Sequence, residues 1–493
     1  MKRRLSLTEI ENVLYHLNYR WSLESLALWK GAAVPFEPYK LYEGYDDFIS
    51  LETLASIDSL EDEAAKMRLR HALIDHYLQR SLLPHETEMR TWMRGASADV
   101  KGEKIYFKDI IPWCQNSSTY ETRRILEKET SALCKFLRPF ALNYWEILLE
   151  ILRDELGFEG YIDYCYQKKG VDYPYFYRVI KDLLEEVDDL YFPAMDLWTR
   201  RRLGLPLRDL NRFDAIKLLS LSEFNGVFPE KSMEELTAFF RYWDIDLNET
   251  PGLYLDLGRE EAKSSQAMCF ILQIPEESYI LMKPEGGWID LETLWHELGH
   301  GLSAVFTSPD LSVVDREMAT SYSLSESFAF LLQNLALSEP FLARYLGLSR
   351  VDSKTLSYYK VLKDLSIFRR YGAKFLAEYE MFSSGNLSDG EPYAEMMARY
   401  TGFYYQPESH LFDLVPEFYC LDYVLGWLGE AMLESHLSRE LGADWMFRSQ
   451  TGAILRRWWK QGNRYDIFEF MENNDLGPLS PKPLLERWHR VLG

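Results

Sequence analysis

Residues 290–302 have the sequence DLETLWHELGHGL, and this stretch decides how the rest of the chain is interpreted. It contains the pattern His-Glu-x-x-His, and apolar residues recur around that pattern at steps of three and four, which predicts an amphipathic helix. Residues four apart lie on one face of a helix, so His296 and His300 can both direct a ring nitrogen at one ion. Glu297 then lies beside that ion, where its carboxylate can act as a general base on a water molecule.

The sequence also predicts how this helix begins and what packs against its two glycines. Asp290 is expected to cap its N-terminus. Gly299 and Gly301 each cost about 1 kcal/mol in a helix interior. Their presence predicts that something packs closely against this turn, and a strand that binds substrate would do so.

A catalytic zinc site needs a third protein ligand besides the two histidines. The extended pattern HExxHxxGxxH supplies a third histidine on the same segment, but Ser303 and Phe306 stand at its Gly and His positions, which excludes that class. A carboxylate from a second helix is then required. Glu326 lies in a predicted helix, although Ser323-x-x-Glu326 is also a capping-box pattern. Spacing alone leaves four candidates open: Asp310, Asp315, Glu317 and Glu326.

The rest of the chain is predicted to be mainly helical. Residues 68–83, 133–151 and 358–382 have helical apolar periodicity, and Pro139 should kink the second of these helices. A short β-hairpin, with strands at 267–274 and 279–282, is expected just before the key helix. The run Arg200-Arg-Arg202 followed by Gly204 and Pro206 is the best candidate for an internal boundary.

With that boundary, we expect residues 1–202 to form an N-terminal helical lobe and residues 203–493 to carry the metal site. The expected architecture is two helical lobes that flank a deep cleft, with a small hairpin or sheet beside the HExxH helix.

The segment from Gln266-Ala-Met-Cys269 through the hairpin to His-Glu-Leu-Gly-His resembles the thimet oligopeptidase and oligoendopeptidase F family of zinc peptidases. The family's third ligand is a Glu about 25 residues past the second His, and Glu326 is 26 residues past His300. The resemblance therefore implies a gluzincin-type site with Glu326 as the third ligand. The family's Pro-Ser-Gln before that Glu is absent here. The match extends over roughly residues 203–492.

A second segment strengthens the resemblance. His410, Tyr419, Tyr423 and Gly426 keep the spacing of the family's His, Pro-Phe-Tyr, Tyr, Gly segment. In that family the His and the Tyr nine residues later face the zinc and steady the oxyanion, which implies this role for His410 and Tyr419, with Tyr423 as a further tyrosine of the cleft. The strand residues expected to pair with the substrate backbone are Met268, Cys269, Phe270 and Ile271.

The resemblance implies one zinc ion per chain and endopeptidase activity on short peptides, with Glu297 as general base. A zinc carboxypeptidase of the Taq carboxypeptidase type is the nearest alternative, since it also uses HExxH and Glu326-Ser327 resembles its Glu-Ser-Gln-Ser. An alternative from another class is a non-catalytic helical protein that binds peptides and retains the fold.

Bulk composition restricts partners and location. The formal net charge is -22, which disfavours nucleic acid as a partner. The basic start at residues 1–5 is not followed by an apolar run, so no signal peptide and no membrane partner are expected. The five cysteines are scattered and form no CxxC, which fits a reducing, cytoplasmic location. A monomer or a simple homo-oligomer is expected.

Overall fold

The computed structural model describes residues 5–32 and 38–493 of the chain. Helices contain 69% of the residues and the sheets are small, so the mainly helical class expected from the sequence is confirmed. The basic residues at positions 2–4, which bear on the signal-peptide expectation, lie outside the described part. Within that part, no helix is both long enough and apolar enough to cross a membrane.

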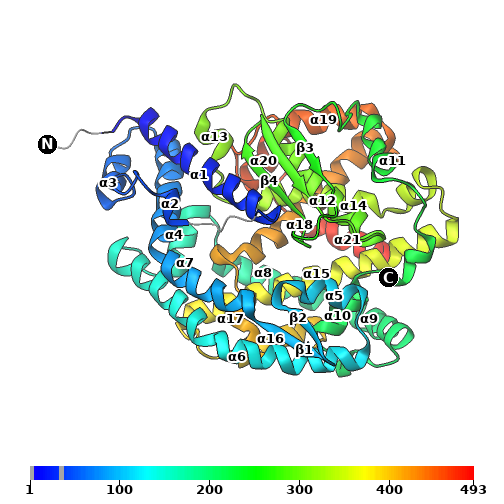
Figure 1. The fold of residues 1–493 in the computed structure, drawn as a ribbon. Coiled ribbons are helices and arrows are strands. Elements are labelled where there is room, and N and C mark those ends of the chain that lie inside the picture. Colours follow the sequence, from blue (N-terminus) through cyan, green and yellow to red (C-terminus); the bar gives the residue numbers. More distant parts are fainter. Residues whose placement is uncertain (1–4, 33–37) are drawn as a thin grey trace. The chain divides into compact units, whose positions relative to one another are not determined.

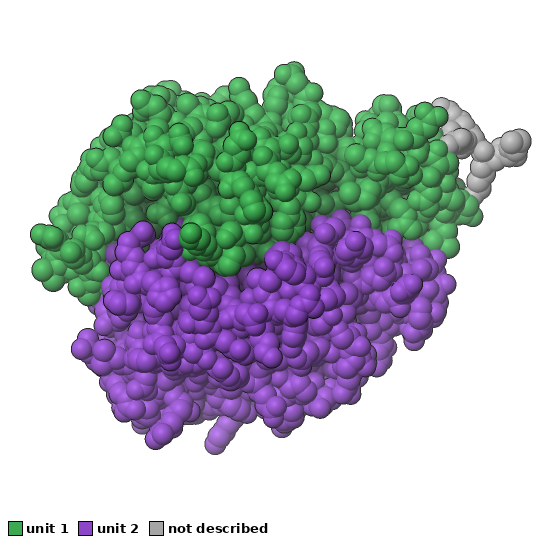
Figure 2. Space-filling model, turned by 180° about the vertical axis from the view of Figure 1, so that it is seen from behind, with its two compact units in different colours: residues 1–80, 227–356, 425–484 green, residues 81–226, 357–424, 485–493 purple. Residues whose placement is uncertain are grey.

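The chain divides into two compact units (Figure 2). Unit 1 contains residues 1–80, 227–356 and 425–484, and unit 2 contains residues 81–226, 357–424 and 485–493. The boundary expected after residue 202 does not coincide with this division, because that position lies inside unit 2. The Arg run occupies the last turn of helix α9 (Asp188–Leu203), where cations complement the helix dipole, and Gly204 ends the helix at φ 75°.

Unit 1 contains the three-stranded sheet visible in Figure 1. The predicted hairpin is confirmed: β4 (Met268–Gln273) pairs antiparallel with β5 (Glu277–Leu281). A strand that the sequence did not indicate, β3 (Leu253–Asp256), adds parallel to β5 and gives the order β3-β5-β4. Helix α1 (Leu7–Trp29) packs against the hairpin, with Leu26 and Trp29 around Phe270.

The remaining helices that lie wholly in unit 1 follow the order of the chain. They are α2 (Pro38–Leu41), α3 (Leu51–Asp58), α11 (Met233–Thr237), α12 (Trp288–Val305), α13 (Val313–Glu317), α14 (Ser323–Ala336), α19 (Ser449–Trp459) and α20 (Ile467–Asn473). Four helices contain residues of both units: α4 (Glu63–Gly95), α15 (Arg350–Ser384), α18 (Tyr419–Leu441) and α21 (Lys482–Leu492).

Unit 2 is built mostly from helices. Its elements are β1 (Ser97–Val100), β2 (Glu103–Tyr106), α5 (Ile110–Asn116), α6 (Tyr120–Glu150), α7 (Tyr161–Lys169), α8 (Tyr173–Glu186), α9, α10 (Arg212–Leu219), α16 (Glu391–Thr401) and α17 (His410–Asp413). The three long helices predicted from periodicity are all present, in α4, α6 and α15. Helix α6 continues through Pro139 and is longer than predicted.

Candidate metal centre

The HExxH segment forms the middle of helix α12, as predicted. The helix begins at Trp288 with Gly287 as its N-cap, so the expectation that Asp290 is the cap residue is wrong. Asp290 lies in the first turn instead, and its carboxylate accepts the backbone N–H groups of Glu285 and Gly286. The Asp290 side chain thus binds the loop that precedes the helix and does not cap the helix N-terminus.

Helix α14 lies against α12 at very short range, and glycine makes this possible. A Cβ atom on Gly299 would lie 2.4 Å from the Cα of Ala329 in α14. A Cβ on Gly426 of α18 would lie 2.6 Å from the Cβ of Glu326. Gly301 faces side chains of β3 and β5. The expected close packing is therefore present: Gly299 adjoins helix α14, and Gly301 adjoins strands β3 and β5 and not β4, the strand expected to bind substrate.

This packing brings together the three ligands proposed from the sequence. The Nε2 atoms of His296 and His300 are 3.3 Å apart. The Glu326 carboxylate lies 3.5 Å from His296 Nε2 and 3.8 Å from His300 Nε2. The three side chains form the one group of His, Cys, Asp or Glu residues among those described that could hold a metal ion, with ligand atoms within 4.8 Å of one another.

Neighbouring polar side chains orient both imidazoles. The Gln333 amide donates to the Glu292 carboxylate at 3.0 Å, so its oxygen faces His296 and accepts the Nδ1–H at 2.8 Å. Ser325 Oγ lies 2.8 Å from His300 Nδ1 and can accept a hydrogen bond from the Nδ1–H group. With each Nδ1 as a donor, each Nε2 presents a lone pair to the shared space.

Burial keeps the imidazole rings of His296 and His300 neutral. Burial lowers the pKa of His296 to about 4. Burial, together with the neighbouring His296, lowers the pKa of His300 well below its usual value. Both imidazoles are therefore uncharged near neutral pH, which is the form that binds a metal.

The residues present fit a divalent cation. The two uncharged imidazoles present lone pairs to the same space as the Glu326 carboxylate, which is 1% exposed, and a bound cation satisfies all three acceptors. Zinc–nitrogen bonds of about 2.0–2.1 Å in a tetrahedral arrangement separate two ligand nitrogens by about 3.3–3.4 Å. The observed separation of the two Nε2 atoms, 3.3 Å, matches this spacing.

The other three candidates for the third ligand lie outside this group. Asp315 pairs with Arg68 at 3.2 Å. Glu317 accepts the backbone N–H of Ile274 at 3.1 Å. Neither belongs to the metal-binding group, nor does the exposed Asp310. The first residue of α14 is Ser323 and its N-cap is Tyr322, so Glu326 does not stand at the capping-box position either.

Glu297 also lies where the sequence places it, on the face of α12 next to strand β4. Its carboxylate accepts the backbone N–H of Cys269 at 2.7 Å. Burial raises the pKa of Glu297 to about 7, with partial opposition from this hydrogen bond. A carboxylate with a pKa near neutrality can both take up and release a proton, as a general acid–base group must.

The four strand residues proposed to meet substrate differ in their surroundings. Met268 is 39% exposed, and the side chains of Cys269 and Ile271 are partly buried. The Phe270 side chain packs into the cluster with Leu26, so any contact it makes with a peptide would have to use its backbone.

The remaining predicted residues, His410, Tyr419 and Tyr423, belong to unit 2. His410 is fully buried, and its two ring nitrogens lie 2.7 Å and 2.9 Å from the backbone carbonyls of Pro407 and Leu387. Both nitrogens are thus occupied inside unit 2, and the structure does not support an oxyanion role for this side chain. Its role toward substrate stays a prediction, since spacing in the sequence does not report burial.

The two tyrosines are placed differently from His410. Tyr419 and Tyr423 lie in the first two turns of α18 and are half-buried. Their rings are 5.1 Å apart, and Tyr423 stacks on Tyr371 at 4.5 Å. Their roles toward substrate stay predictions.

Sequence reasoning missed Glu292, Ser325 and Gln333, the residues that orient the two histidines. A partial signal was available, since Glu292 is four residues before His296 and on the same helix face. Ser325 and Gln333 lie on α14, and only the pairing of α12 with α14 reveals their contacts.

The solved structures that this fold resembles include peptidases. Trypanosoma cruzi metallocarboxypeptidase 1 matches over 99% of both chains with a TM-score of 0.63 and 15% identity. A putative oligoendopeptidase F from Bacillus anthracis matches over 98% of this chain and 84% of its own, with a TM-score of 0.56 and 15% identity. The M32 carboxypeptidase from Deinococcus radiodurans R1 matches over 99% of both chains, with a TM-score of 0.56 and 14% identity.

The chain thus has the fold that metallocarboxypeptidases and oligoendopeptidase F share. No protein-family model and no curated protein matches the sequence. The resemblance to the thimet and oligoendopeptidase F family is therefore supported at the level of the shared fold, which includes carboxypeptidases as well.

Proposed function

We propose that this protein is a zinc-dependent peptidase that hydrolyses short peptides, with one zinc ion held by His296, His300 and Glu326. The observation that carries the proposal is the convergence of these three buried ligands beside a fourth buried side chain, Glu297, suited to acid–base work. A structural role for the cluster would not require a second carboxylate with a raised pKa at its edge.

The residues of the chain divide the work. A zinc ion in this site would supply Lewis acidity and would lower the pKa of a coordinated water. Glu297 takes a proton from the attacking water and delivers it to the leaving amine. The N–H of Cys269 holds the Glu297 carboxylate in place, while Gln333 and Ser325 hold the imidazoles.

Strand β4 supports recognition of the peptide through its backbone. Among the described strands β4 is an edge of its sheet. Because N–H groups alternate in direction along a strand, Cys269 and Ile271 point their N–H groups to the same side, away from β5. Because the Cys269 N–H already donates to Glu297, a peptide added along this edge would pair with the backbone at Ile271. Backbone pairing fixes the register without demanding particular side chains, so broad sequence preference is expected.

We place the activity in the endopeptidase class, because the segment from His410 to Gly426 resembles that of oligoendopeptidases. A carboxypeptidase is the second candidate, favoured by matches over 99% of both chains.

All five cysteines are free, in keeping with the cytoplasmic location that we also propose. We propose a monomer or simple homo-oligomer as the assembly state.

A digest of a peptide library, with and without a zinc chelator and read by mass spectrometry, tests the proposal. Cleavage that the chelator abolishes and added zinc restores is expected. Absence of any chelator-sensitive cleavage would instead favour the non-catalytic peptide-binding alternative. An internally quenched peptide with an amidated C-terminus separates the two peptidase classes, because an endopeptidase cleaves it and a carboxypeptidase does not.

A further inference from the structure

The turn that leads into Tyr419 is strained. Two consecutive residues other than glycine, Glu417 and Phe418, have φ values of 62° and 49°. The left-handed conformation costs about 1–2 kcal/mol for each such residue. Strain of this kind persists only where the surrounding structure fixes it, and it concentrates at functional sites.

Helix α7 holds this turn through its polar side chains. The N–H of Glu417 donates to Tyr161 Oη at 2.5 Å, and its carbonyl accepts from Lys169 Nζ at 2.6 Å. The Glu417 carboxylate accepts from Tyr164 Oη at 2.7 Å and from Lys168 Nζ at 2.8 Å. Burial alone would raise the pKa of Glu417, but the two ammonium groups lower it to about 2, so the carboxylate is charged.

Lys169 extends the contact into the helix that carries the tyrosine. Its Nζ lies 2.7 Å from Asp422 in the first turn of α18, and both side chains are 2% exposed. One ammonium group thus bridges the carbonyl of the strained turn and a carboxylate three residues past Tyr419. Any rotation of the start of α18 relative to the turn would break one of these two contacts.

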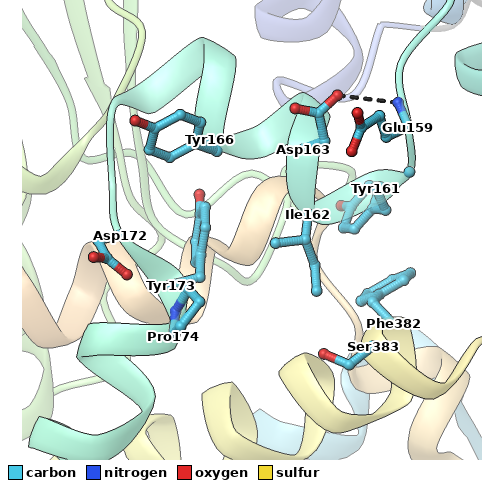
Figure 3. Close-up of a pocket in the computed structure, with 11 residues that line it drawn as sticks. Glu159, Tyr161, Ile162, Asp163, Tyr166, Asp172, Tyr173, Pro174, Phe382 and Ser383 are labelled. Carbon is cyan, nitrogen blue, oxygen red and sulfur yellow. Dashed lines mark hydrogen bonds between the residues drawn. The ribbon is translucent and has the colours of Figure 1, made fainter.

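Aromatic rings surround Phe418, which is 1% exposed. Phe418 contacts Tyr173 at 4.7 Å, and Tyr161 and Phe382 at 5.6 Å. These three residues also line a pocket of about 620 Å³ (Figure 3). Aromatic packing thus holds Phe418, while the ionic contacts hold the neighbouring Glu417.

We infer that Lys169, with Glu417 and Asp422, positions Tyr419 for the reaction. The inference rests on the proposed peptidase function. A buried ion pair adds little net stability compared with apolar side chains of similar size, so stability alone does not account for this network. Its effect is to hold the first turn of α18 at one angle, and misplacement of a reacting group by about 1 Å can cost about 100-fold in rate.

The test is a double-mutant cycle on the zinc-loaded enzyme, using Lys169→Met and Tyr419→Phe and a quenched peptide. Lys169→Met should lower kcat about tenfold or more while KM stays within about twofold. In the Tyr419→Phe background the same change should alter kcat by less than about twofold, because the tyrosine hydroxyl is already gone. Equal losses in both backgrounds, or an unchanged kcat in Lys169→Met, would overturn the inference.

Matched variants separate positioning from loss of folding. Arg123 and Asp214 form another buried ion pair of unit 2, and Arg123→Met should destabilise the protein without changing kcat per folded molecule. If Lys169→Met does not fold, the kcat values of Glu417→Gln and Glu417→Ala test the positioning role instead. The Gln variant keeps an oxygen for Lys168 and Tyr164 and should retain most of kcat, whereas the Ala variant should lose about tenfold; similar kcat in both would overturn the inference. An inactive wild-type enzyme would overturn the proposed function itself.

Discussion

The metal centre of unit 1 and the tyrosine segment of unit 2 hold their polar side chains in different ways. The ligands lie on two regular helices, α12 and α14, whose close approach depends on Gly299. Tyr419 instead follows a strained turn that two lysines of α7 hold in place. The first arrangement depends on the close packing of two helices, and the second on buried ion pairs.

This difference separates the expected effects of mutation. Changes at the centre of unit 1 should act on metal content or on proton transfer. Changes around the turn of unit 2 should act on rate while the metal stays bound.

Glu297→Gln should give the largest loss. The amide keeps the size of the side chain but cannot take up a proton, so kcat should fall by about 1,000-fold or more while zinc content stays at one ion per chain. Glu317→Gln is the matched control, since Glu317 is another largely buried Glu of unit 1 whose pKa is raised to about 7. Steady-state kinetics with elemental analysis checks both variants, and an active Glu297→Gln would exclude Glu297 as the base.

Glu326→Ala should act through the metal. Loss of the only carboxylate in the ligand group should weaken zinc binding by at least about 100-fold, more than loss of an outer contact does. Competition with a chelator of known affinity measures this change. Undiminished affinity would show that another residue completes the site.

Gln333→Leu should have a smaller effect of the same kind. It removes the acceptor for His296 Nδ1 and leaves the three ligands in place, so zinc affinity should fall about tenfold. Asn334→Leu on the neighbouring position of α14 serves as a control. Equal affinity in Gln333→Leu and wild type would mean that packing alone orients His296.

Glu317→Gln should change the pH dependence of stability. Burial raises the pKa of Glu317 to about 7 in the folded protein, against an ordinary value of 4.5, so the folded state binds more protons between these pH values. Stability is therefore lost as pH rises from 4.5 through 7. Gln does not ionise, so relative to wild type the variant should gain about 1–3 kcal/mol between pH 5 and pH 8. Urea unfolding at both pH values checks this, and a constant difference would contradict it.

The sequence predicted the regular part of the molecule well, for physical reasons. Helical periodicity and the four-residue spacing of His296 and His300 are local properties, and so is the hairpin before α12. Glu326 could be selected only through a resemblance, because no local pattern says which carboxylate a second helix delivers.

Properties that depend on distant contacts were not predictable. The division into units follows contacts among segments far apart in the chain. The residues from Arg202 to Gly204 mark the end of helix α9 and not a boundary between units. The spacing of residues in the sequence also does not reveal which groups His410 contacts, namely the carbonyls of Pro407 and Leu387. Nor does it reveal that side chains of α7 bind Glu417.

Anomalous diffraction at the zinc edge, from crystals grown with zinc, would locate the ion and identify its ligands. The expected result is one strong peak per chain, about 2.0–2.1 Å from the Nε2 atoms of His296 and His300 and about 2.0–2.2 Å from a carboxylate oxygen of Glu326. A zinc peak bound by other residues, or no peak between these three side chains, would contradict the account.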